Sequence, residues 1–182
     1  MIITISGRQG AGKTTLAKSL AKRLGYEFIS IGDLQGELAL EKGMTITELM
    51  TLEKTQPQIH REIDEKTRKL GETKNNFVVE GWIAYHFIPS SYKIFLTVDE
   101  KIGCARIFND YRPDEPKKET LEKTLENQRH RLEETQKGFQ KAHGIDFLDQ
   151  SQYDFVLDTS FLNADEVLNK LEREVRYAQN NI

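Results

Sequence analysis

Residues 7–14 (GRQGAGKT) combine the residue types that bind a polyphosphate, and they match the pattern G-x-x-x-x-G-K-[ST]. Glycines allow the backbone to turn so that several N–H groups point at one anion. Lys13 supplies a point charge that can reach the outer phosphates, and the hydroxyl of Thr14 is placed to ligate Mg²⁺. The stretch therefore predicts a site for a nucleoside triphosphate, with ATP and Mg²⁺ as the expected ligands.

The flanks of this stretch have the pattern that the chemistry needs. Ile2–Ser6 (IITIS) is nearly all apolar, as in a strand buried on both faces, and Thr14–Leu24 has the leucine spacing of an amphipathic helix. The helix would direct its positive N-terminal dipole at the phosphates. The alternative, a glycine turn that only joins strand to helix, fits this context less well. The expected nucleotide-binding residues are Gly7, Gln9, Gly10, Ala11, Gly12, Lys13, Thr14 and Thr15.

Strand and helix patterns alternate along the rest of the chain, which predicts an α/β fold with a parallel sheet covered by helices on both faces. The helical stretches at about 33–71 and 111–142 are too long for ordinary connections and are expected to be binding inserts. Further strands are expected at Tyr26–Ile31, Phe77–Glu80, Lys93–Val98 and Tyr153–Leu157. Helices are expected at 33–41, 45–52, 57–70, 99–109, 117–142 and from 163 or 165 to 178.

Length and composition limit the class of protein. A chain of 182 residues predicts a single domain, 1–182, and a net charge of −3 argues against a general nucleic-acid binder. The single cysteine, Cys104, cannot form an intramolecular disulfide and fits a reducing compartment. Neither a membrane span nor a signal peptide is expected. We therefore expect a cytoplasmic monomer or homodimer whose partners are small nucleotides.

Charged side chains near the expected carboxyl edge of the sheet are candidate catalytic groups. Glu80 ends the third strand, where it could hold a metal-bound water or orient an acceptor; the alternative is a carboxylate that caps the next turn. Arg106 and Arg131 could stabilise charge on a transferring phosphoryl group, but they could also belong to a solvated helix face. Arg112 and Arg129 have the same two interpretations.

Four residues are candidates for acceptor binding. Asp33 follows the second strand and could contact an acceptor or cap a helix. Arg61 could bind a phosphate, as could Arg68 on the same expected helix, although surface ion pairs are an equal possibility. Trp82, in the stretch WIAYH, could stack on a base or close the core beneath the insert.

Among proteins with this nucleotide motif, small-molecule kinases compete with NTPase switches and motors. The guanine-reading N-K-x-D segment of regulatory GTPases is absent from the sequence, and motor ATPases are usually larger. A short chain with two helical inserts favours a nucleoside monophosphate kinase.

Five blocks of the chain have a recognisable order and spacing: 31–49 (IGDLQGELALEKGMTITEL), 55–64 (TQPQIHREID), 77–82 (FVVEGW), 98–107 (VDEKIGCARI) and 143–160 (HGIDFLDQSQYDFVLDTS). Through these blocks the chain resembles the archaeal-type cytidylate kinase family over nearly its whole length. The resemblance implies ATP- and Mg²⁺-dependent phosphoryl transfer to CMP or dCMP. It also implies a three-layer P-loop kinase fold with strand order 2-3-1-4-5, an acceptor-binding insert and a lid insert.

The sequence departs from the family pattern at positions that usually carry arginine. Gly36 and Trp82 occupy two of these positions, and Gly138–Phe139 replace a usual Arg-Tyr pair. Arginine binds phosphate oxygens through a planar, permanently charged fork. Two alternatives to a cytidylate kinase therefore stay open: a kinase for another small acceptor, and a nucleotide-binding regulatory protein that does not transfer phosphoryl groups.

Overall fold

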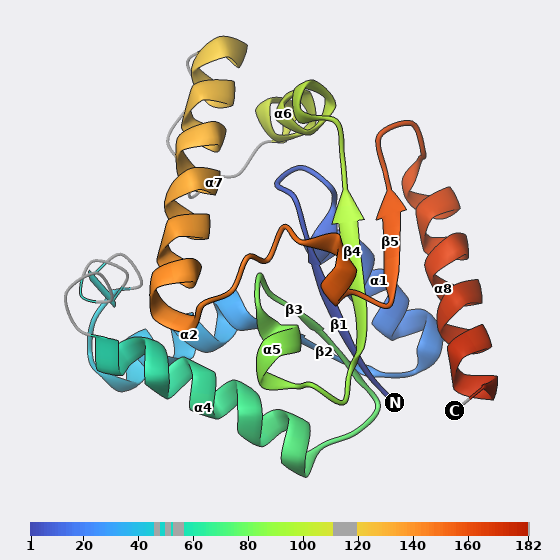
Figure 1. Cartoon of the computed structure of the whole chain (residues 1–182), viewed down its shortest axis with the longest axis horizontal. Helices are drawn as coiled ribbons and strands as arrows, with labels where there is room; N and C mark the ends of the chain where they lie inside the picture. Colours follow the sequence, from blue (N-terminus) through green and yellow to red (C-terminus); the bar gives the residue numbers. More distant parts are fainter. Residues whose placement is uncertain (46–47, 50–51, 53–56, 111–119, 182) are drawn as a thin grey trace.

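The computed structural model describes residues 1–45, 48–49, 52, 57–110 and 120–181. Its centre is one parallel sheet of five strands in the order β2-β3-β1-β4-β5 (Figure 1). Both the α/β class and the expected strand order are therefore confirmed. The strands are β1 (Ile2–Gly7), β2 (Glu27–Ser30), β3 (Phe77–Glu80), β4 (Tyr92–Thr97) and β5 (Phe155–Asp158).

Strand β1 is central because its side chains can be buried on both faces, and all six of its residues are buried. It pairs with β3 on one side and β4 on the other. Its two polar side chains have partners, as buried hydroxyls require: Thr4 Oγ1 lies 3.0 Å from Ser91 Oγ, and Ser6 Oγ donates to Gly81 O at 2.9 Å. Strand β1 therefore holds the start of the glycine-rich loop in a fixed position.

Helices cover both faces of the sheet and make a three-layer arrangement. On one face α1 and α8 pack together over β1, β3 and β4. On the other face, α5 and the segment before β5 form a second core, and α4 lies beside α5 (Figure 1). The helices are α1 (Lys13–Leu24), α2 (Ile31–Glu41), α4 (Pro57–Thr73), α5 (Ala84–Phe87), α6 (Glu100–Asn109), α7 (Leu121–His143) and α8 (Ala164–Asn180), with a 3₁₀ turn η1 at Gln150–Gln152.

Capping residues explain where several helices begin. Helix α2 starts two residues before the expected Asp33, because Ser30 Oγ accepts a hydrogen bond from the backbone N–H of Asp33 at 3.4 Å. Ser30, rather than Asp33, is therefore the N-cap. Helix α8 starts after Asn163, which forms a reciprocal capping box with Glu166. The expected start of α7 at 117 lies outside the described residues.

Other expected boundaries shift or fall partly outside the described residues. Thr45 and Glu48 form the expected reciprocal hydrogen bonds at 2.7 and 3.2 Å, although half of the helix expected at 45–52 lies outside the described residues. Strand β5 begins two residues later than expected because Tyr153 ends η1, and its hydroxyl donates to Phe147 O. Among the helices formed by the described residues, none combines the length and apolar character that a bilayer crossing requires.

Candidate functional site

The loop of residues 7–14, called the P-loop below, packs so closely that it needs glycine. Gly10 and Gly12 have φ angles of +76° and +85°, in the left-handed region. A Cβ on Gly10 would lie 2.3 Å from Gly103 O in α6, and a Cβ on Gly7 would lie 2.3 Å from Leu96 O in β4. The loop backbone therefore sits directly against two elements far from it in sequence.

The N-terminus of α1 is open in a way that suits an anion. Gly12 is its N-cap and offers no side-chain hydrogen bond, and the first turn contains no acidic residue. The first N–H groups of any α-helix lack intrahelical partners, and here they belong to Lys13, Thr14 and Thr15. With the glycine turn before it, this end presents N–H groups and positive dipole to one place. The geometry suits a phosphate group.

Lys13 and Thr14 face the end of β3. Lys13 Nζ donates to Arg8 O at 3.0 Å and lies 4.7 Å from the ring centroid of Trp82. Thr14 Oγ1 donates to Glu80 Oε2 at 3.4 Å. Burial raises the pKa of the Glu80 carboxyl, the charge of Lys13 opposes that rise, and nearby Asp33 adds to it. The sheet therefore brings these predicted catalytic and metal-binding groups together.

The hydroxyl of Thr14 and the carboxylate of Glu80 are hard oxygen donors, the kind that Mg²⁺ prefers. Their 3.4 Å separation allows one ion to be held by Thr14 directly and by Glu80 through a water. Among the described residues no group of three or more His, Cys, Asp or Glu could hold a metal ion. A magnesium ion here would thus complete its shell with phosphate oxygens and water, as Mg²⁺ usually does.

Arg106 joins the P-loop to the segment after β5. Its Nη1 donates to Gly10 O at 3.4 Å and to Thr159 Oγ1 at 3.1 Å. Its Nη2 donates to Thr159 O at 2.7 Å and to Ser160 O at 3.1 Å. The guanidinium is therefore bonded to backbone oxygens around the nucleotide loop. Its predicted action on a transferring phosphoryl group stays a prediction.

The arginines of the predicted lid lie differently. Arg129 forms a bidentate pair with Glu100, with distances of 2.8 and 2.6 Å, and so joins α7 to α6. Arg131 is exposed on α7, and within the described residues no hydrogen bond or ion pair joins it to the P-loop. Arg112 lies outside the described residues. Of the predicted lid cations, the structure therefore shows one in an ion pair and one facing solvent.

The acceptor-side candidates are spread along α2 and α4. Asp33 is exposed in the first turn of α2, close enough to Glu80 to affect its pKa. Arg61 is exposed on α4, whereas Arg68 pairs with Glu65 and lies 5.8 Å from the Phe87 ring. Asp33 on α2 is thus close to the P-loop groups. Arg61 and Arg68 lie on α4, the other helix of the predicted insert.

Trp82 is half-buried between the P-loop lysine and an apolar cluster. Its ring meets the ring of Phe147 edge-to-face, with centroids 5.0 Å apart and planes at 76°. Tyr85, three residues further on, is buried and donates to Gln152 Oε1 at 3.1 Å. His86 is exposed. Trp82 therefore contributes to the core and also borders the site, whereas its predicted stacking on a base stays a prediction.

The predicted acceptor insert and the predicted lid helix meet at the end of α7. His143 Nε2 lies 3.7 Å from Asp64 Oδ2 of α4, and both side chains are largely buried. Burial, reinforced by the nearby His60, lowers the pKa of His143. The lower end of α7 lies beside α4 in Figure 1. The two inserts are therefore in direct contact.

Sequence reasoning missed several residues that hold the site. Gly103, inside α6, is needed because a Cβ there would lie 2.9 Å from Gln9 O. Thr159 Oγ1 lies within hydrogen-bonding distance of Thr97 O, at 3.0 Å. A glycine in the middle of a predicted helix was the available signal for Gly103, since such glycines usually mark close packing.

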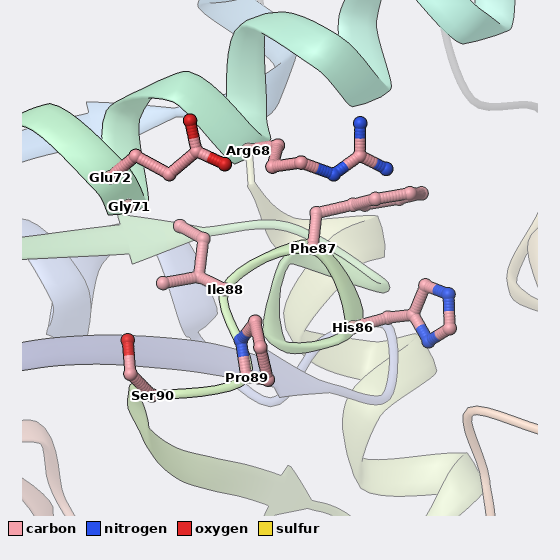
Figure 2. A pocket seen from close by; sticks show the side chains of 8 residues that line it. All are labelled: Arg68, Gly71, Glu72, His86, Phe87, Ile88, Pro89 and Ser90. Atoms are coloured by element: carbon pink, nitrogen blue, oxygen red, sulfur yellow. The ribbon is translucent and has the colours of Figure 1, made fainter.

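A separate hollow of about 300 Å³ lies between α4 and the segment from α5 to β4 (Figure 2). Its lining includes both apolar and polar side chains, and none of its lining residues belongs to the P-loop. It is therefore distinct from the site described above. The lining residues are Arg68, Gly71, Glu72, His86, Phe87, Ile88, Pro89 and Ser90.

Solved structures share this fold at low sequence identity. An uncharacterized protein from Eubacterium ventriosum has a TM-score of 0.74 at 17% identity, with 97% of this chain and 98% of that chain covered. Shikimate kinase from Bacteroides thetaiotaomicron has a TM-score of 0.68 at 18% identity, with the same coverage. The fold is therefore that of P-loop kinases.

Relatives found by sequence identify the family, whereas the solved structures show the fold alone. Cytidylate kinase from Methanocella arvoryzae is 36% identical over 160 residues, which cover 88% of each chain. An S-adenosylmethionine-dependent nucleotide dehydratase from Lacinutrix mariniflava is also 36% identical, over 166 residues, but the chain spans only 34% of that relative's length. The sequence model of the cytidylate kinase-like family matches residues 2–161. On this combination of fold, P-loop and sequence, the chain belongs to the cytidylate kinase-like family.

Proposed function

We propose that the protein transfers the γ-phosphoryl group of ATP to a nucleoside monophosphate, with CMP or dCMP as the acceptor. The observation that carries the proposal is the open N-terminus of α1, with Lys13 and Thr14 directed toward Glu80. Family membership supports the acceptor class. An acceptor phosphate oxygen attacks the γ-phosphorus, the bond to the bridging β–γ oxygen breaks, and ADP leaves.

In this proposal the donor side acts by position and charge, as phosphoryl transfer requires. Gly7, Gln9, Gly10, Ala11, Gly12 and Thr15 would surround the triphosphate, largely through the loop backbone. Lys13 would neutralise the outer phosphates. Thr14, and Glu80 through a water, would hold Mg²⁺, which supplies charge neutralisation when bound. The ionised acceptor phosphate is itself a nucleophile, so Glu80 need not act as a general base.

The acceptor side of the proposal uses Asp33, Arg61 and Trp82, with Arg106 and Arg131 stabilising charge on the transferring group. Helices α2 and α4 would form the acceptor insert at about 33–71, and α7 most of a lid at about 111–142, within one domain. Closure of such inserts excludes water and brings cations to the reacting group. Arg61 and Arg131 are both exposed, so closure would have to redirect them toward the P-loop.

A second candidate is a nucleotide-binding unit that serves another enzyme without transferring phosphoryl groups. It is favoured by the 36% identity to a stretch of a nucleotide dehydratase, in which the matched region is 34% of the protein. The exposed position of the arginines is compatible with this reading as well. Both candidates need the same ATP site, so they differ only at the acceptor.

The test is ADP formation from MgATP in the presence of CMP, dCMP, UMP, AMP or GMP. We expect CMP or dCMP to raise the rate at least tenfold above the rate with MgATP alone. Lys13→Ala should remove that stimulation, whereas Lys22→Ala, an exposed lysine on the same helix, should keep it. Tight MgATP binding with no acceptor-stimulated turnover would contradict the kinase proposal and support the second candidate.

A further inference from the structure

Lys13 contacts more than its own loop. Its Nζ donates to Arg8 O at 3.0 Å and also lies 4.7 Å from the ring centroid of Trp82, the single tryptophan of the chain. Arg8 belongs to the P-loop, whereas Trp82 comes from the segment between β3 and α5. The ammonium group is thus positioned by two separate parts of the chain.

Trp82 is itself firmly held. The preceding Gly81 accepts a hydrogen bond from Ser6 Oγ at 2.9 Å and donates its N–H to Ile5 O at 3.2 Å. A Cβ on Gly81 would lie 2.5 Å from Ile31 Cγ1, so the backbone here packs tightly against α2. On its other side, the indole ring meets the fully buried ring of Phe147. The packing around Gly81 and Phe147 therefore holds the indole ring in one position.

An aromatic face suits a lysine that must bind phosphate. It attracts the ammonium charge through its quadrupole, and indole does so best. It offers no lone pair comparable to a carboxylate oxygen, so the ammonium does not have to break a strong ion pair with it to reach phosphate oxygens. A long lysine chain otherwise loses much rotamer freedom when it is fixed. The ring reduces that cost before the ligand arrives.

We propose that Trp82 is a positioning residue for the donor site, which holds the Lys13 ammonium in place for the outer phosphates of the bound triphosphate. This role rests on the ATP site proposed above, and it differs from stacking on an acceptor base. Trp82 therefore sets affinity for MgATP when no acceptor is present.

The test is calorimetric binding of MgATP without acceptor. Trp82→Leu removes the ring and is expected to weaken binding about 2- to 30-fold, the equivalent of one cation–π contact. Trp82→Phe keeps an aromatic face and should retain most of the affinity. Tyr177→Leu, a matched change at an exposed ring on α8, should have no effect. Wild-type affinity in Trp82→Leu, or equal losses in both Trp82 variants, would overturn the proposal.

Fluorescence gives a readout that a purely structural role would not change. Because Trp82 is the single tryptophan, its emission reports the neighbouring Lys13. Nucleotide-free wild type and Lys13→Met should differ in emission, and MgATP should change the wild-type spectrum. Identical spectra, or a Trp82→Leu defect confined to the KM for the acceptor, would overturn the proposal. Failure of the wild type to bind MgATP would instead refute the proposed function.

Discussion

The two sides of the candidate site are built differently. On the donor side, Gly10 lies against Gly103, and Arg106 bonds to oxygens of Gly10, Thr159 and Ser160. On the acceptor side, charged groups of α2 and α4 pair at the surface, as Lys66 does with Glu41. Exposed pairs of this kind contribute little to stability. In the proposed function, donor binding would therefore be fixed by packed backbone, whereas acceptor choice would depend on side chains that can change without disturbing the fold.

The helix ends repeat this contrast. Helix α1 begins at an N-cap without a side-chain hydrogen bond, whereas Ser30 caps α2 and places Asp33 in its first turn. A capped, acidic N-terminus has its own partners, and an uncapped one has N–H groups for a ligand. Helix α1 thus lacks the local stabilisation of a side-chain cap, which suits the proposed anion site.

The largest predicted effect is that of a substitution at Gly10, on the donor side of the site. Gly10→Ala places a Cβ 2.3 Å from Gly103 O at a φ of +76°. We expect the free energy of unfolding to fall by about 3 kcal/mol, because backbone must move on both sides. MgATP binding should be lost with it. Urea unfolding and calorimetry measure both quantities.

The matched controls are glycines of the insert helices. Gly36→Ala in α2 and Gly138→Ala in α7 add a Cβ that meets nothing within 4 Å. Alanine in a helix interior should raise the free energy of unfolding by about 0.5–1 kcal/mol. If these variants were destabilised as much as Gly10→Ala, the contrast between the two sides would not hold.

The next effect concerns Arg106. Arg106→Lys keeps the charge but cannot reproduce hydrogen bonds to both Gly10 and Ser160. We expect the free energy of unfolding to fall by about 1–3 kcal/mol and MgATP affinity to fall about tenfold. Binding and unfolding measured on one preparation separate the two effects. A variant with weak turnover but unchanged stability and MgATP affinity would show that Arg106 acts on the transferring group alone and does not hold the P-loop in place.

The third prediction concerns Glu80, which lies between the P-loop on the donor side and Asp33 on the acceptor side. Its pKa is raised, chiefly by burial, so the folded state binds more protons than the unfolded state just above pH 4.5. Stability without nucleotide should therefore decline as pH rises through that window, and this slope should disappear in Glu80→Gln. Glu37→Gln, at an exposed site on α2, is the control. An unchanged stability slope in Glu80→Gln would contradict this account.

The smallest effect is expected at the exposed pair between α6 and α7. Glu100→Gln removes the bidentate partner of Arg129. Because the pair is largely exposed, we expect a loss of at most about 1 kcal/mol in the free energy of unfolding, and less in high salt. Thermal unfolding at two salt concentrations measures it. A large loss that is insensitive to salt would mean that this junction is more than a surface contact.

The features that the sequence predicts well depend on local pattern. The P-loop, the strand order and the Thr45–Glu48 capping box follow from short stretches or from a whole-chain resemblance. The four-residue helix α5 is too short to show a period. The Arg106–Thr159 bond joins residues 53 positions apart, and the contact of Lys13 with Trp82 likewise depends on the folded sheet. Such contacts leave no local signal.

The most direct test of the central claim is the fate of the γ-phosphoryl group. The protein would be incubated with Mg²⁺, CMP and ATP carrying a radioactive γ-phosphate, and the label followed into CDP and inorganic phosphate. The account predicts label in CDP for the wild type and none for Lys13→Ala. Label that stays in ATP, or appears only in inorganic phosphate, would contradict phosphoryl transfer to CMP.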